Sequence, residues 1–279
     1  MKLRWAWILG VVVSGCTMGG DDSGAAGSAP ADAASGGSGG ASADAAGEAA
    51  SDDPPAVEGT WAQILFYASI NDVPAVGKTN GSTTTLQRVT VQRTGTTLTM
   101  QVEPCTIEVD NGTPVVATII PDAFVRSLGV TERTGSLVLG AGQWRYVQDR
   151  NLQLRGVHLA QPETDPLPTD IDDPQIWDQD EDGNPGVTVR ITGITDGEVY
   201  VVQRDAHALD GVIVGDRMDG LADWNTDQVV LGSDNPILNM QTSVVKDPDA
   251  TASYFRSTRV DATKTCEAIV AERDQLFSR

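Results

Sequence analysis

The chain has 279 residues, and its 39 acidic side chains outnumber its 19 lysines and arginines, which gives a formal net charge of −20. This charge excludes binding to nucleic acid or to anionic lipid head groups, because both require an excess of basic residues. It favours divalent cations instead. Removing Lys2 and Arg4 with the first fifteen residues leaves 19 − 2 = 17 basic residues and a charge of 17 − 39 = −22.

The N-terminus has the layout of an export signal. Two basic residues precede an apolar run, Trp5–Val13, that is too short to span a bilayer, which predicts a signal peptide over residues 1–15. The segment Val13-Ser14-Gly15-Cys16 then resembles the lipobox of bacterial lipoproteins. The resemblance implies that Cys16 is acylated and becomes the mature N-terminus, and that Thr17 after it directs the anchor to the outer membrane. The alternative is an ordinary secretory signal in which the cysteine occurs by chance.

Residues 16–57 form a low-complexity segment rich in glycine, alanine, serine and aspartate. From residue 17 onward it contains no aromatic residue, no lysine and no arginine. A segment of this composition buries too little apolar surface to fold, so we predict a disordered tether. Its root-mean-square span is about 35 Å, enough to lift a domain off a membrane. We expect residues 58–279 to form one β-rich domain.

Short runs of alternating apolar and polar residues predict antiparallel strands. They occur at 86–93, 97–102 and 187–192, separated by turn sequences, of which Asp110-Asn111-Gly112 is the clearest hairpin signal. The chain is therefore predicted to be mainly β, a single antiparallel meander that forms a barrel or a sandwich. Two helices are expected: a short internal one over Pro121–Gly129, and a C-terminal one that begins near Asp261.

The C-terminal helix is expected to place five residues along one apolar face: Ala262, Cys266, Ile269, Val270 and Phe277. Because Cys266 belongs to that face, a disulfide with Cys105 would join the helix to the strands. An isolated pair of cysteines in an exported protein usually forms such a bond. The alternative is two buried free thiols.

The segment Gly59-Thr60-Trp61 at the start of the first strand, followed by a meander and a late helix, resembles lipocalins and other calycin barrels. The resemblance implies that the tryptophan closes one end of a barrel whose interior holds a small apolar ligand. As a whole, the tether and the domain resemble uncharacterised surface lipoproteins of myxobacteria. This second resemblance implies no particular activity.

The most distinctive chemical feature is the acidic loop WDQDEDGNPG, residues 177–186. Asp178, Asp180 and Asp182 alternate before Gly183, the spacing with which calcium loops surround a cation. An EF-hand is excluded, because the twelfth position is Val189 where a bidentate glutamate is needed. We expect a strand-connecting calcium loop instead, whose fourth ligand comes from Asn184 or a neighbour.

Further ligands for this calcium site lie just upstream, at Asp170, Asp172 and Asp173. No lysine or arginine occurs between Arg155 and Arg190 to neutralise the cluster. The predicted cofactor is thus Ca²⁺ in a structural role, and the alternative is an acidic turn neutralised by solvent.

No common catalytic motif is present. The two histidines, His158 in a strand-like run and His207 in an expected turn, are interpreted as ordinary surface or core residues. We therefore predict a non-enzymatic binding or interaction module. We expect it to be anchored by lipid in the cell envelope, at the outer membrane. Its partner is a protein, a glycan or a small apolar ligand. Two alternatives stay open: a calycin-like carrier, and a surface hydrolase that uses clustered carboxylates.

Overall fold

The computed structural model describes residues 53–73, 76–241 and 243–278. The predicted signal peptide, Cys16 and most of the predicted tether lie outside these residues. The described chain belongs to one compact unit, Glu48–Arg279. None of its helices is both long enough and apolar enough to cross a membrane.

The described residues form mainly β structure, as the alternating sequence runs predict. All three predicted runs lie within strands. The strands are β1 (Gly59–Val73), β2 (Gly77–Thr94), β3 (Thr97–Asp110), β4 (Val116–Ile119), β5 (Thr131–Gly140), β6 (Gln143–Arg155), β7 (Val187–Gly193), β8 (Gly197–Val214), β9 (Arg217–Ser233), β10 (Ser243–Lys246) and β11 (Tyr254–Val260). They belong to one 11-stranded sheet in which every pairing is antiparallel.

The sheet closes on itself. The order β1-β2-β3-β5-β6-β8-β9-β11 returns to β1, because β11 pairs with both β9 and β1. Of the two folds that the sequence predicts, a barrel or a sandwich, the structure therefore has the barrel. Closure also removes the unpaired edges that an open sheet of this length would expose.

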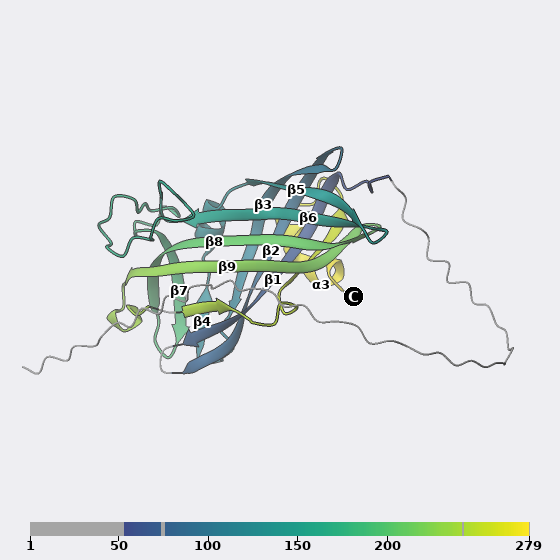
Figure 1. The fold of residues 1–279 in the computed structure, drawn as a ribbon. Helices are drawn as coiled ribbons and strands as arrows, with labels where there is room; N and C mark the ends of the chain where they lie inside the picture. Colours follow the sequence, from purple (N-terminus) through teal and green to yellow (C-terminus); the bar gives the residue numbers. More distant parts are fainter. Residues whose placement is uncertain (1–52, 74–75, 242, 279) are drawn as a thin grey trace, which may run out of the picture. The chain divides into compact units, whose positions relative to one another are not determined.

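The wall is rebuilt toward one end of the barrel. Pairing of β3 with β5 stops at Val102, and further along β3 pairs with β4 at Val109. There β4 pairs with β7, and β7 with the start of β8, so these two short strands replace β5 and β6. Figure 1 shows β4 and β7 at the end opposite to α3 (Arg273–Leu276). At the same end β10 pairs with β1.

The strand β10 is tied to β9 by a side chain. Both ends of the Gln241 amide bond the backbone of Val230, whose N–H donates to Oε1 at 3.1 Å while Nε2 donates to the carbonyl at 2.8 Å. The Gln241 side chain thus makes the pair of hydrogen bonds to β9 that the backbone of a neighbouring strand would make.

The internal helix is found close to its predicted position, as α1 (Asp122–Ser127), and a short 3₁₀ helix, η1 (Pro236–Leu238), follows β9. The predicted start of the C-terminal helix near Asp261 is wrong, because α2 is Cys266–Ala271 and Thr265 caps it. Asp261 instead accepts hydrogen bonds from the backbone and hydroxyl of Thr263 and forms a local turn.

The short helix α2 covers the outer face of the barrel. Ile269, fully buried, packs against the outward sides of Ala62 and Leu86. The Cys105–Cys266 disulfide is formed, with 5.0 Å between the Cα atoms, and joins α2 to β3. The predicted apolar face holds for Ile269 and Phe277, which are buried, whereas Val270 is 40% exposed and Ala262 precedes the helix.

The barrel interior is packed with apolar side chains at the end where β1 begins. Trp61 is fully buried in this core, donates its Nε1–H to the Val57 carbonyl at 2.9 Å and carries the Arg259 guanidinium 4.3 Å from its ring centre. Met100, Tyr146 and Phe255 complete the packing. The rest of the interior contains buried polar side chains such as His207, and a cavity.

Candidate functional site

A cavity of about 660 Å³ occupies the rest of the barrel interior. It runs from His207, 6% exposed, to the exposed side chains of Ile194, Ile237 and Met240 at the end rebuilt by β4 and β7. The strands supply space here because Ser69, Thr83 and Thr85 point inward where the packed end has larger residues. This volume is typical of sites for small molecules.

The walls near the mouth are apolar. Phe124 and Leu128, in and just after α1, line the opening together with Val109, Ile191 and Val199. Phe124 also lies under a guanidinium, since Cζ of Arg155 is 5.9 Å from its ring centre. An apolar body that enters from this end would therefore find apolar walls before it meets the charged floor.

The floor of the cavity contains two arginines. Arg155 on β6 forms an ion pair with Asp205 and donates Nη1–H to Gln203 Oε1 at 3.1 Å. Arg133 on β5, 5% exposed, donates Nη1–H to His207 Nε2 at 2.9 Å. Among the described residues, no carboxylate lies within ion-pair distance of Arg133.

The contact with Arg133 fixes the state of His207. An arginine can only donate, so Nε2 of the imidazole must be the unprotonated acceptor and the ring is neutral. Burial, followed by the nearby Arg133 and Arg155, holds the pKa of His207 well below its usual value. The expected turn around His207 is wrong, because the residue lies within β8. Gly211 permits close packing against Phe255 there and does not mark a turn.

Several buried polar atoms at the floor have no hydrogen-bond partner. They include the Tyr67 hydroxyl, the Thr131 hydroxyl and Nε of both Arg133 and Arg155. Tyr67 packs against Trp224 and His207, which orient its ring, and burial raises the pKa of its phenol. All four of these groups can donate, whereas Asn151, opposite His207 on β6, leaves one acceptor atom, its Oδ1, without a partner. Unpartnered donors therefore outnumber unpartnered acceptors at the floor.

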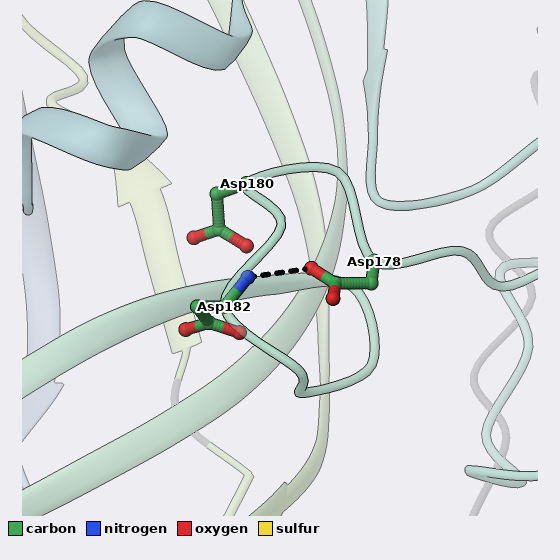
Figure 2. Close-up of side chains that lie close together, drawn as sticks. All are labelled: Asp178, Asp180 and Asp182. Carbon is green, nitrogen blue, oxygen red and sulfur yellow. Dashed lines mark hydrogen bonds between the residues drawn. The ribbon is translucent and has the colours of Figure 1, made fainter.

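The second candidate site is the acidic loop. Its base is closed by two backbone hydrogen bonds between residues 177–179 and Gly186. Asp178 then accepts hydrogen bonds from the N–H groups of Asp182 at 3.1 Å and Gly183 at 2.8 Å. The loop thereby turns back on itself and gathers the carboxylates of Asp178, Asp180 and Asp182, with ligand atoms within 4.8 Å of one another (Figure 2).

Asp180 is the buried member of this triad, at 9% exposure. Its Oδ2 accepts the N–H of Thr188 at 3.0 Å, whereas its Oδ1 has no partner. Burial, opposed by that hydrogen bond and reinforced by the charges of Asp182 and Asp178, raises the pKa of Asp180. None of the ion pairs in the described part of the chain includes a member of the triad.

Thr188 brings a further oxygen to the loop. Its hydroxyl is buried and forms no hydrogen bond of ordinary geometry. It is nevertheless close to Asp182: burial raises the pKa of that carboxyl, but the Thr188 side chain and Asn184 more than offset this and lower it. Sequence reasoning missed Thr188, because a threonine in an alternating strand carries no signal of this kind.

The structure gathers only part of the predicted ligand set. Asn184 lies at the loop and donates its N–H to Asp182 at 2.9 Å. Asp172 and Asp173 do not join the triad, nor does Asp170. Asp170 and Asp173 accept hydrogen bonds from Asp172 and Gln175 two residues further on, so they stabilise their own turns.

The arginines and Tyr67 at the cavity floor were also missed from the sequence. In an alternating strand, Arg133 points to the same face as Leu137, and Arg155 to the same face as Gln153. This alternation was the one indication in the sequence that the two arginines point into the barrel. Charged residues in alternating strands normally face solvent, so the alternation alone did not identify them. His158, by contrast, is exposed and stacks on Trp177, as expected of a surface histidine.

Comparison of the chain with protein-family models, with curated proteins and with solved structures gives no match.

Proposed function

We propose that this protein binds a small amphipathic molecule inside its barrel and does not transform it. The observation that carries the proposal is the cavity of about 660 Å³, with an apolar mouth and a polar floor. Among the alternatives drawn from the sequence, a carrier accounts for this interior, whereas a module that binds proteins or glycans on its surface gives no reason for it.

A hydrolase that uses clustered carboxylates is less well supported. The carboxylates that line the cavity are those of Asp72 and Asp205. Asp72 is exposed, while Asp205 is neutralised by Arg155 and accepts a hydrogen bond from Thr226 at 2.6 Å. A glycosidase needs one carboxyl group free to act as an acid and another free to act as a base or nucleophile.

The carrier proposal is tested with N-phenyl-1-naphthylamine, a neutral probe whose fluorescence rises in apolar surroundings. We expect saturable binding to the full chain after its export into an oxidising compartment. Val109→Trp, which fills the apolar wall, should weaken probe binding tenfold or more. Val138→Trp is the matched control, because Val138 is 45% exposed on the outside of the barrel. Loss of binding in both variants, or in neither, contradicts the proposal.

We also propose that the acidic loop binds a calcium ion that stabilises it. Two observations support a cation here beyond the cluster of acids: the unpartnered Oδ1 of buried Asp180, and the buried hydroxyl of Thr188, which brings a further oxygen close to the Asp182 carboxylate. Carboxylate and hydroxyl oxygens are ligands that calcium accepts in a flexible geometry. Asp178, Asp180, Asp182 and Thr188 would hold the ion, and water would complete the shell.

Native mass spectrometry tests this second proposal. We expect one bound calcium per chain that is removed by chelation and lost in Asp180→Asn. Asp172→Asn makes the same change in charge outside the triad and should keep the ion. A protein that stays free of calcium at millimolar concentrations refutes the site.

The lipid anchor at Cys16 and the place in the cell envelope remain proposals, supported by the N-terminal sequence alone. Cys16→Ser should abolish labelling by a fatty-acid analogue in cells. Labelling that persists in this variant would refute acylation at Cys16.

A further inference from the structure

We infer that the molecule bound in the barrel carries an anionic head group, most simply a carboxylate, which lies at the floor against Tyr67, Thr131 and Arg155. This inference rests on the proposed carrier function and specifies the chemistry of its ligand. It is carried by the charges and the unpaired donors of the floor.

The first argument is the charge balance of the floor. The floor contains two guanidinium groups, those of Arg133 and Arg155, and one carboxylate, that of Asp205, which pairs with Arg155. His207 adds no charge, because its Nε2 must accept from Arg133. One positive charge is therefore uncompensated inside a chain whose formal net charge is −20. An unpaired buried charge is costly, and an anion at the cavity floor, separated from Arg133 by His207, would offset part of that cost.

The second argument is the direction of the missing hydrogen bonds. The unpartnered buried groups at the floor include four that can donate, the hydroxyls of Tyr67 and Thr131 and Nε–H of the two arginines, against one acceptor, Asn151 Oδ1 opposite His207. Tyr67, Thr131 and Arg155 line the cavity itself, whereas Arg133 lies behind His207. Tyr67 is close enough to both arginines for their charges to act on its phenol. Groups that lack acceptors select a ligand rich in acceptor oxygens.

The third argument is that the cavity walls are apolar near the mouth and polar at the floor. An apolar body that occupies the mouth, between Phe124 and Val199, would direct one end of the molecule toward the floor. The cavity therefore matches a molecule with a negative end and an apolar body. A cluster of ordered waters is the other way to satisfy the donors, and it predicts no preference for an anion.

Competition against N-phenyl-1-naphthylamine separates these cases. We compare dodecanoate with dodecan-1-ol, which has the same chain and no charge. The full-length protein should bind dodecanoate at least tenfold more tightly, since hydrogen bonds to charged groups contribute about tenfold or more in affinity. Arg133→Gln should remove most of this preference for the acid over the alcohol. Arg145→Gln, the same charge change at an exposed site, should keep the preference.

A second variant guards against misfolding of Arg133→Gln. Tyr67→Phe keeps the ring against Trp224 and removes a hydroxyl that has no partner in the protein. It should lower dodecanoate affinity about fivefold and lower dodecan-1-ol affinity by a smaller factor, because a hydrogen bond to a charged group contributes more.

The outcomes distinguish the two proposals. If the neutral probe binds but the acid and the alcohol compete equally, or neither competes, the carrier function survives and the anionic head group is refuted. If the neutral probe does not bind, the carrier function itself fails.

Discussion

Calcium should raise the thermal stability of the domain by an amount that depends on its concentration. A ligand that binds the folded state stabilises it by RT ln(1 + [L]/Kd). Extracellular calcium modules have dissociation constants of about 10⁻⁴ to 10⁻³ M. Taking about 10⁻⁴ M, the gain is about 1.4 kcal/mol at 1 mM calcium and about 2.7 kcal/mol at 10 mM. At about 2–4 °C per kcal/mol, these gains shift Tm by about 3–6 °C and about 5–11 °C.

The structure locates the origin of this gain. Without a cation, Asp180 keeps a buried, unpartnered Oδ1 next to the charges of Asp178 and Asp182. Circular dichroism melts with calcium and with a chelator measure the shift, and magnesium serves as the control cation because it fits multi-carboxylate sites poorly. Asp180→Asn should lose the dependence on calcium, whereas Asp172→Asn should retain it. A Tm that does not change between chelator and 10 mM calcium would refute the reasoning.

Three further predictions concern the domain as a whole. Replacing Cys105 and Cys266 by serine should cost about 2–5 kcal/mol in urea unfolding, since the bond closes a separation of 161 residues; a loss below about 1 kcal/mol would contradict this. Ile269→Ala should cost about 2–4 kcal/mol because Ile269 is fully buried, whereas Val270→Ala, at 40% exposure, should cost less than about 1 kcal/mol. His207, whose pKa is lowered in the folded state, binds protons more readily when unfolded, so its contribution to stability is present above about pH 6.5 and falls by about 1.4 kcal/mol per pH unit below it. The difference between wild type and His207→Gln in urea unfolding at pH 7 and pH 5 measures that contribution, and equal pH slopes would contradict it.

The strands could be predicted from the sequence because their apolar periodicity is local. Runs such as 86–93 alternate between the barrel interior and the outside, and the pattern needs no knowledge of partners. Closure of the barrel is a different matter. It depends on pairing β11 with both β1 and β9, across nearly the whole length of the chain, and periodicity fixes faces but not partners.

The same distinction between local patterns and long-range pairing applies to the two candidate sites. The carboxylates of Asp178, Asp180 and Asp182 are neighbours in sequence, so their spacing predicted their cluster. Thr188 joins them through the backbone bond to Asp180, a contact made by the fold. At the cavity floor, Arg133 and His207 meet from strands β5 and β8, 74 residues apart. Neither residue alone distinguishes an inward charge from a surface charge, so only the register of the barrel could bring them together.

The two proposed sites share a structural element, and this leads to a last prediction. Gln179, between two members of the acidic triad, lines the cavity and accepts the Gly156 N–H at 2.7 Å. The strand β7, which begins directly after the loop, forms part of the cavity wall through Val189. A cation that orders the loop would therefore also reduce the freedom of the wall that contacts the ligand.

Calcium should accordingly increase the affinity for N-phenyl-1-naphthylamine, and by thermodynamic reciprocity the probe should increase the affinity for calcium by the same factor. Couplings of this kind are typically about fivefold or more. Two titrations measure it: probe into protein with calcium or chelator, and calcium into protein with or without saturating probe. Gln179→Ala should reduce the coupling while calcium still binds. If the wild-type protein binds calcium and its probe affinity stays the same, the loop and the cavity are independent.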